Sequence, residues 1–303
     1  MTEVRDILLK IGYSDLRDFG KQWRMAPLYR SSDNNTSLAV NKLTGQWYDF
    51  SARMGGSIQK LIQLTLNLHT LAEASTVLGT LPELQSHADH KYELTQVKKF
   101  DKNLLFKLQK NHEYWENRKI SKHIIELFEG GTIFNGKMAY RYVFPIYDEN
   151  QDLIGFSGRM LNDKPEFPKW KHCGAKSNWL YPLKLNADII TEYKEVILVE
   201  SIGDMLSLWE NGIKNVLVTF GIEVSKKIIE FLLRINIKHI VVAFNNDEDN
   251  EFVGNEAAVD AKKKLMSYFD EDQITIAIPD QKDFGVMNSE QINLWKQQHN
   301  LKN

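Results

Sequence analysis

The sequence predicts an α/β protein whose C-terminal part is built on a parallel sheet, preceded by an α+β region and by a small β domain. Short apolar runs such as Val196–Val199 and Ile240–Phe244 alternate with helical stretches from residue 191 onward. Such alternation is typical of a parallel sheet flanked by helices. Nearer the N-terminus, an alternating stretch at 37–50 carries a turn signal at Thr44-Gly45, which predicts a β-hairpin.

The small domain is expected to span residues 1–82. It opens with an amphipathic helical stretch and passes through a polar loop at Ser31–Asn35 before the hairpin. From Gly56 to Leu78 apolar residues recur at helical spacing, and Ser57 is a plausible N-cap for this helix. Residues 83–100 are polar and charged, so we expect them to form a linker.

The α+β region is expected to span residues 101–190. Helical patterns at 101–119 and 121–130 are followed by strand patterns at 138–148 and 152–160, joined by a turn. The last region, 191–303, contains the alternating elements. We expect strands at 196–200, 215–220, 239–244 and 274–278 and helices at 203–211, 224–236 and 254–269.

Composition restricts the class of protein. The chain has 303 residues, of which 43% are hydrophobic and 26% charged, as in ordinary globular proteins. No run approaches the roughly 20 apolar residues of a membrane span, and the first residues do not resemble a signal peptide, so we expect a cytoplasmic protein without a membrane partner. The single cysteine, Cys173, excludes an internal disulfide and a thiolate-rich zinc site. A net charge of −2 leaves nucleic-acid binding open, because local clusters decide it.

Clusters of carboxylates follow three of the predicted parallel strands. Because parallel strands end at one edge of a sheet, these acids are expected to converge there. Converging carboxylates repel one another unless a divalent cation joins them, which predicts Mg²⁺ and phosphate chemistry. The acids are Glu200 and Asp204, then Asp247, Glu248 and Asp249, then Asp280 and Asp283.

In this order the acids resemble the TOPRIM domain, which primases share with topoisomerases and some nucleases. The family pattern is a strand ending in Glu, an Asp four residues later, a second strand with Asp-x-Asp before an Ala-Ala helix, and a Lys-Asp pair. The sequence departs from it at Ser201, where Gly is usual, and at Asn245, where the first Asp of the pair is expected. The resemblance implies a catalytic set of Glu200, Asp204, Asp247, Asp249, Lys282 and Asp283. It also implies a Mg²⁺ or Mn²⁺ site made by Asp247, Asp249, Asp283 and Glu200, with the Asn245 carbonyl oxygen as a possible ligand.

The α+β region resembles bacterial and phage primases more narrowly. It contains the segments YWENRKIS, FPIYDENQDLIGFSGR, PKW and WLYPL, which match the primase block before TOPRIM and are missing from topoisomerases. Bases and aromatic residues are interleaved here, as suits a single-stranded template or a triphosphate. The expected nucleic-acid or nucleotide ligands are Arg118, Arg159, Lys169, Trp170, Lys171, Lys176 and Trp179.

The small domain resembles the primase zinc ribbon with its metal ligands replaced. The four ligand positions hold Ala26, Tyr29, Asp49 and Ala52, which cannot form a tetrahedral zinc site. We therefore expect a zinc-ribbon-like template-binding domain without zinc. Packing by the aromatic residues at 47, 48 and 50 is expected to hold it together.

These resemblances imply a phage-like DNA primase, a nucleotidyltransferase that makes short RNA primers on single-stranded DNA from ribonucleoside triphosphates during DNA replication. If it is phage-encoded, it would act in the cytoplasm of a bacterial host. Two alternatives remain open: a TOPRIM nuclease that uses the same acids, and a non-catalytic module that binds DNA or a helicase. The sequence ends shortly after Asp283, so a replicative helicase, if needed, is expected to be recruited in trans.

Overall fold

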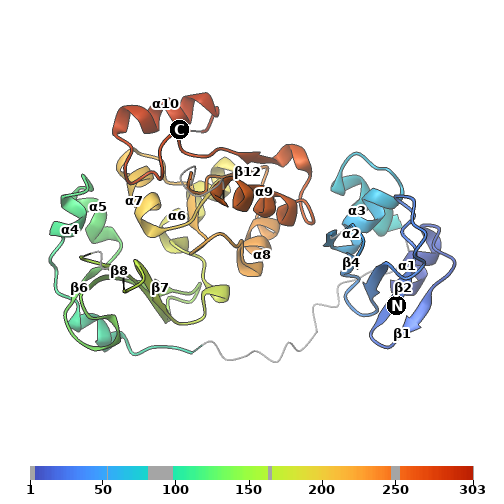
Figure 1. Ribbon diagram of the computed structural model, residues 1–303, viewed down its shortest axis with the longest axis horizontal. Coiled ribbons are helices and arrows are strands. Elements are labelled where there is room, and N and C mark those ends of the chain that lie inside the picture. The colour runs from blue at the N-terminus through green and yellow to red at the C-terminus, as the bar shows by residue number, and fades with distance from the viewer. Residues whose placement is uncertain (1–3, 53, 81–97, 163–165, 247–252, 303) are drawn as a thin grey trace. The chain divides into compact units, whose positions relative to one another are not determined.

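The computed structural model describes residues 4–52, 54–80, 98–162, 166–246 and 253–302, and the chain divides into two compact units (Figure 1). The first comprises Met1–Glu93 with Lys263–Asp272, and the second comprises Leu94–Lys262 with Gln273–Asn303. Among the described helices, none has the length and apolar character needed to cross a membrane.

An antiparallel sheet and helices form the first unit. Five strands lie in chain order, β1 (Arg17–Phe19), β2 (Gln22–Met25), β3 (Leu38–Asn41), β4 (Trp47–Asp49) and β5 (Met54–Gly56). The helices are α1 (Val4–Lys10), α2 (Ile58–Thr65) and α3 (Leu71–Thr80). The predicted hairpin is confirmed as β3 and β4, and the Ser57 hydroxyl caps α2 by accepting a hydrogen bond from the Lys60 N–H at 3.3 Å.

Two expectations for this unit were wrong. The apolar run that follows Ser57 forms two helices, because Asn67 adopts a left-handed conformation (φ 52°) that ends the first one. The aromatic residues around Asp49 do not all pack inward, because side chains alternate along a strand. Trp47 lies in the core, whereas Tyr48 and Phe50 are 43% and 51% exposed.

The second unit begins with short helices and a second antiparallel sheet, of which β6, β7 and β8 are labelled in Figure 1. Its strands pair in the order β6 (Gly131–Ile133), β7 (Arg141–Tyr147), β8 (Leu153–Met160) and β9 (Trp170–Cys173). The strands β7 and β8 confirm the predicted pair. The short helices and turns are η1 (Lys102–Lys107), α4 (Glu113–Glu116), α5 (Lys122–Leu127), η2 (Gly136–Met138) and η3 (Lys176–Asn178).

The single helix expected at 101–119 was wrong. It is divided into η1 and α4 because the backbone between them pairs with β6. The N–H groups of Gln109 and Thr132 each donate to the other residue's carbonyl at 2.8 Å. A pairing partner more than twenty residues away therefore overrides the local helical pattern.

The parallel sheet predicted for the C-terminal region is confirmed. Its strands lie in the order β11 (Val216–Val218), β10 (Glu195–Val199), β12 (His239–Val242) and β13 (Ile274–Ile276), and every neighbouring pair is parallel. The connecting elements are α7 (Ile202–Glu210), α8 (Lys226–Arg234), α9 (Val253–Leu265) and η5 (Glu271–Gln273), and the sheet is preceded by α6 (Leu183–Tyr193) and followed by α10 (Ser289–Gln298). The helices α6 and α10 were not expected from the sequence.

One hydrophobic core joins the parallel sheet to the preceding antiparallel sheet. Phe144 and Ile146 of β7 belong to the same buried cluster as Ile197 and Val199 of β10. Strand β10 has β11 on one side and β12 on the other, so the chain changes direction across the sheet at its end. In open α/β sheets such a switch point, outside the carboxyl ends of the strands, is where ligands bind.

Candidate functional site

The loops after the parallel strands meet around a cleft of about 530 Å³. Glu200 directly follows β10, and its Oε1 accepts a hydrogen bond from the Asn245 N–H at 2.9 Å. The Gly221 N–H, after β11, donates to the Glu200 carbonyl at 3.1 Å. The Asn246 N–H donates to the Lys282 carbonyl at 2.9 Å, which joins the loops after β12 and β13. These bonds fix three loops around Glu200.

Asp204 lines this cleft from the first turn of α7. The Ser201 hydroxyl caps the helix by accepting from the Asp204 N–H and donates to Asp204 Oδ2 at 2.7 Å. The side chain is 3% exposed. Burial and the negative charge of Asp283 raise the pKa of Asp204 to about 7, with a further contribution from Glu200, while the bond from Ser201 opposes the shift. A crowded set of carboxylates therefore faces the cleft.

Several features of this edge fit a hard divalent cation. Asn245 lines the cleft, and its Oδ1 is buried without a hydrogen-bond donor from the described part of the chain. A carbonyl oxygen beside carboxylates is a ligand set that Mg²⁺ accepts. Among the described residues, no three acids, histidines or cysteines are close enough to hold an ion by themselves. The expected ligands Asp247 and Asp249 lie outside the described residues.

The wall opposite the acids is basic and aromatic. Arg118, Arg159, Lys169 and Trp170, all expected from the sequence, line the same cleft as Glu200, Asp204, Asn245, Lys282 and Asp283. Arg159 is only 9% exposed, and its Nη1 donates to the Met160 carbonyl at 3.1 Å. The Trp170 ring stacks on Trp115 with centroids 6.3 Å apart. The structure thus brings nine of the residues expected at the site into one cleft.

Three of the expected ligands do not line this cleft. Trp179 is 1% exposed, so its ring cannot stack on a base, and the expectation was wrong. Its ring occupies space left by Gly155, where an added Cβ would lie 2.3 Å from the Trp179 Cζ2 atom. Lys176 donates from Nζ to the Phe220 carbonyl at 2.9 Å, and Lys171 is exposed on β9.

Some residues of the cleft were not expected from the sequence. The Tyr114 ring lies under two guanidinium groups, with the Arg118 Cζ 3.8 Å and the Arg159 Cζ 5.6 Å from its centroid. The four-residue spacing of Tyr114 and Arg118 could have indicated this contact. His172 also lines the cleft, where burial and the nearby cations Lys176 and Arg141 lower its pKa to about 4, so it is a neutral imidazole near neutral pH. In the sequence, a histidine next to Cys173 without further ligands gave no reason to place it in the cleft.

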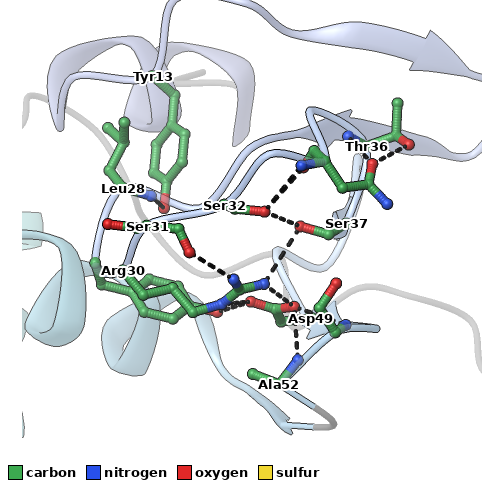
Figure 2. A network of polar contacts seen from close by, with 12 residues as sticks. Tyr13, Leu28, Arg30, Ser31, Ser32, Thr36, Ser37, Asp49 and Ala52 are labelled. Carbon is green, nitrogen blue, oxygen red and sulfur yellow. Dashed lines mark hydrogen bonds and ion pairs between the residues drawn. The ribbon is translucent and has the colours of Figure 1, made fainter.

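A second polar centre lies in the first unit, where the zinc-ribbon comparison places Tyr29 and Asp49 at ligand positions. The Asp49 carboxylate is fully buried and accepts hydrogen bonds from the Tyr29 hydroxyl at 2.7 Å and from the Arg30 guanidinium at 2.8 and 2.7 Å. The backbone N–H groups of Ser51 and Ala52 donate to it at 3.0 and 3.1 Å. Figure 2 shows Arg30 and Ala52 pointing at the Asp49 carboxylate. We call this set of five residues the Asp49 hub.

Aromatic rings and bases pair in the sheet of the first unit, where Phe19 and Phe50 are exposed and Trp23 is half-buried against the core. The Arg24 guanidinium lies 5.3 Å from the Phe19 ring centroid and 4.8 Å from that of Phe50. The Lys42 ammonium lies 4.1 Å from the Trp23 centroid. Arginine and exposed aromatic rings are the groups with which proteins bind single-stranded nucleic acid.

The chain is similar to known proteins both in sequence and in fold. A Toprim-like family model matches residues 197–286. A DNA primase of Borreliella burgdorferi is 25% identical over 275 residues, 72% of this chain and 52% of that protein. A DNA primase of Campylobacter jejuni is 22% identical over 267 residues, 72% of this chain and 43% of that protein. One from Legionella pneumophila is 34% identical over 137 residues, 40% of this chain and 23% of that protein. The chain spans about half or less of the length of these relatives.

Solved structures of primases share the fold. The Aquifex aeolicus primase structure with zinc-binding and RNA polymerase domains has a TM-score of 0.52 and 18% identity, covering 97% of this chain and 82% of that chain. A DnaG primase catalytic domain bound to single-stranded DNA has a TM-score of 0.54 and 20% identity, covering 65% and 76%. The chain is thus similar to bacterial DNA primases and has a DnaG-like fold with a TOPRIM parallel sheet.

Proposed function

We propose that this chain, with the sequence relationship and fold of bacterial DNA primases, synthesises short RNA primers on single-stranded DNA. One observation carries the proposal: the acids at the edge of the parallel sheet and the bases of the opposite wall line one cleft. Template-directed nucleotide addition needs acids and bases together. The acids hold a metal that binds the triphosphate, and the bases hold the template beside it.

The acidic edge would hold the metal. In this proposal Asp283, with Asp247 and Asp249, holds Mg²⁺ or Mn²⁺, and the Asn245 carbonyl oxygen is a further ligand. A bound divalent cation would neutralise triphosphate charge and lower the pKa of the primer 3′-hydroxyl. Glu200, whose Oε1 is oriented by the Asn245 N–H, would serve as a further ligand or as the general base. Lys282 would place a positive charge beside the leaving phosphates.

The opposite wall would hold the substrates. Arg118 and Arg159, both over the Tyr114 ring, would bind phosphate oxygens. Lys169 would add positive charge, and Trp170 would offer a ring face on which a base stacks. Catalysis would come mainly from positioning and electrostatic stabilisation, as is usual in phosphoryl transfer.

The first unit would hold the template, as a zinc-free relative of the primase zinc ribbon. The exposed rings of Phe19 and Phe50, with the Arg24 guanidinium close to both, support this role. The Asp49 hub supports the absence of zinc. Tyr29 and Asp49 stand at two of the four positions that hold zinc ligands in the primase zinc ribbon, and here their side chains are hydrogen-bonded to each other. A replicative helicase would be recruited in trans.

A primer-synthesis assay tests the proposal. The full chain is incubated with a single-stranded template, ribonucleotides and Mg²⁺, and the products are separated by length. Asp283→Asn is expected to reduce synthesis at least about 100-fold, because a metal ligand is lost. Asp280→Asn is the matched control, since Asp280 lies in the same loop but is exposed and does not line the cleft.

The other outcomes of this assay separate the alternatives. Metal-dependent shortening of the template, lost in the Asp283→Asn variant, would mean that the chain is a nuclease. Template binding without new products or cleavage would mean that it is a non-catalytic replication module. Equal synthesis by the Asp283 and Asp280 variants would exclude the proposed metal site.

A further inference from the structure

A second cavity, of about 400 Å³, adjoins the acidic cleft within the second unit. Both cavities are lined by Arg118, Ile120, Ser207, Gly285 and Val286. A linear polymer that is bound with one end in the cleft can therefore extend into the second cavity. Val286 lies at this junction with 61% of its surface exposed, so it offers an apolar surface to a sugar or a base.

The second cavity differs from the cleft in charge. Its lining contains one carboxylate, Glu210, and Oε2 of that group accepts hydrogen bonds from the Ser121 N–H and hydroxyl, both at 2.8 Å. The remaining polar groups are amides, hydroxyls and cations, including Asn117, Asn211 and Lys119. Such groups bind phosphate oxygens and sugar hydroxyls rather than a metal ion.

Lys119 is the most informative residue of this cavity. It is exposed at the rim and adopts a left-handed conformation with φ 65°. Glycine or asparagine would take this conformation more easily than lysine. Its ammonium has no ion-pair partner among the residues that the structure describes, so neither backbone geometry nor a salt bridge accounts for a lysine here.

We propose that this cavity, hereafter the primer groove, binds the sugar-phosphate backbone of the growing RNA strand. The inference rests on the proposed primase function. In the proposed function the template would lie along Arg159, Lys169 and Trp170, whereas the primer groove opens beside Gly285, two residues after the proposed metal ligand Asp283. The proposed function would place the 3′-hydroxyl beside Asp283, so the strand that carries it would leave past Val286 toward Lys119.

Binding of a short, fluorescently labelled single-stranded oligoribonucleotide without metal tests the groove directly. Fluorescence anisotropy is measured with the full chain over a series of salt concentrations. Lys119→Asn removes the charge and suits the left-handed backbone. It is expected to weaken binding several-fold and to reduce the slope of log affinity against log salt by about 1.

A charge-matched control and a second variant complete the experiment. Lys137→Asn removes an exposed lysine of the same unit that lines neither cavity, and it should leave both quantities unchanged. Asn117→Asp is isosteric and places a negative charge in the groove, so it should also weaken binding several-fold. Unchanged affinity in both groove variants, or an equal loss in the Lys137→Asn control, would overturn the proposal.

Primer synthesis distinguishes failure of the groove from failure of the enzyme. If the wild-type chain makes no primers but the groove variants still lose oligoribonucleotide binding, the primase function fails and the groove stands as an RNA-binding site. If the groove variants bind normally while wild-type synthesis is intact, the primase function stands and the groove is excluded.

Discussion

The Arg30 guanidinium holds the buried carboxylate of Asp49 through two hydrogen bonds, 2.8 Å from Nε and 2.7 Å from Nη2. With the Tyr29 hydroxyl and two backbone N–H groups, it joins segments that are distant in the sequence to one carboxylate. The first unit is small, and a small domain usually needs such a tie in addition to its hydrophobic core.

Asp49→Asn is expected to destabilise the first unit by about 2–4 kcal/mol, because a buried acceptor of charged hydrogen bonds is replaced by an amide. Chemical denaturation followed by tryptophan fluorescence measures the change. The control is Asp18→Asn, which breaks an exposed ion pair with Lys42 and should cost little. An equally small loss in both variants would show that the Asp49 hub does not stabilise the fold.

The Asp49 hub also predicts that the stability of the first unit depends on pH. Burial raises the pKa of Asp49, but the bonds from Arg30 and Tyr29 outweigh this and lower it to about 2. A lowered pKa contributes stability above the ordinary value of 3.8, and that stability is lost as the pH falls toward 2. The stability gap between wild type and Asp49→Asn should therefore be full near neutral pH and shrink in acid. A constant gap in acid denaturation curves would contradict this assignment.

The raised pKa of Asp204 predicts that stability depends on pH in the opposite direction. Because its folded pKa of about 7 lies above the ordinary 3.8, the folded chain keeps a proton that the unfolded chain has released between these values. Stability then falls as the pH rises through this window, and the penalty is complete above it. In metal-free protein, Asp204→Asn should melt at a higher temperature than wild type at alkaline pH, with the difference vanishing in acid.

Mg²⁺ provides the check on this prediction. A cation beside Glu200 and Asp283 compensates the same charge, so Mg²⁺ should raise the melting temperature of the wild type more at alkaline than at acidic pH. The Asp283→Asn variant should respond less. Equal responses of both proteins to Mg²⁺ would mean that the cation binds elsewhere.

Gly285 should control the position of Asp283. A Cβ at Gly285 would lie 3.1 Å from Asp283 Oδ1, so the carboxylate would have to move by a few tenths of an ångström. Gly285→Ala should reduce metal-dependent synthesis roughly 10-fold or more with little loss of stability, since shifting a ligand weakens a metal site. Gly79→Ala, where no atom lies within 4 Å of the added Cβ, should not reduce synthesis.

Trp179 and Trp170 should behave differently although both were expected to stack on bases. Trp179→Ala empties a buried site and should cost about 3–5 kcal/mol of unfolding free energy. Trp170→Ala should instead weaken single-stranded DNA binding by about 1–3 kcal/mol. Denaturation and template titration separate the two effects. A selective loss of DNA affinity in the Trp179 variant would contradict its place in the core.

The sequence predicted the parallel sheet and its acidic edge because both arise from local patterns. The strand of four apolar residues before Glu200 and the Asp four residues later are features of one short segment. The features that the sequence did not predict depend on contacts with residues that are distant in the sequence. The helix expected at 101–119 is interrupted by pairing with Thr132, and Trp179 is buried because Gly155 leaves room for it. Arg30 was missed because it lies beside a compared ligand position rather than at one.

The Asp49 hub also changes what can damage the first unit. Thiolate ligands of a structural metal are oxidised or captured by competing chelators, and either event releases the metal. The hub is made of a carboxylate, a guanidinium, a phenol and backbone amides, none of which has comparable redox chemistry. The Asp49 hub itself therefore depends neither on a thiolate nor on a bound metal ion.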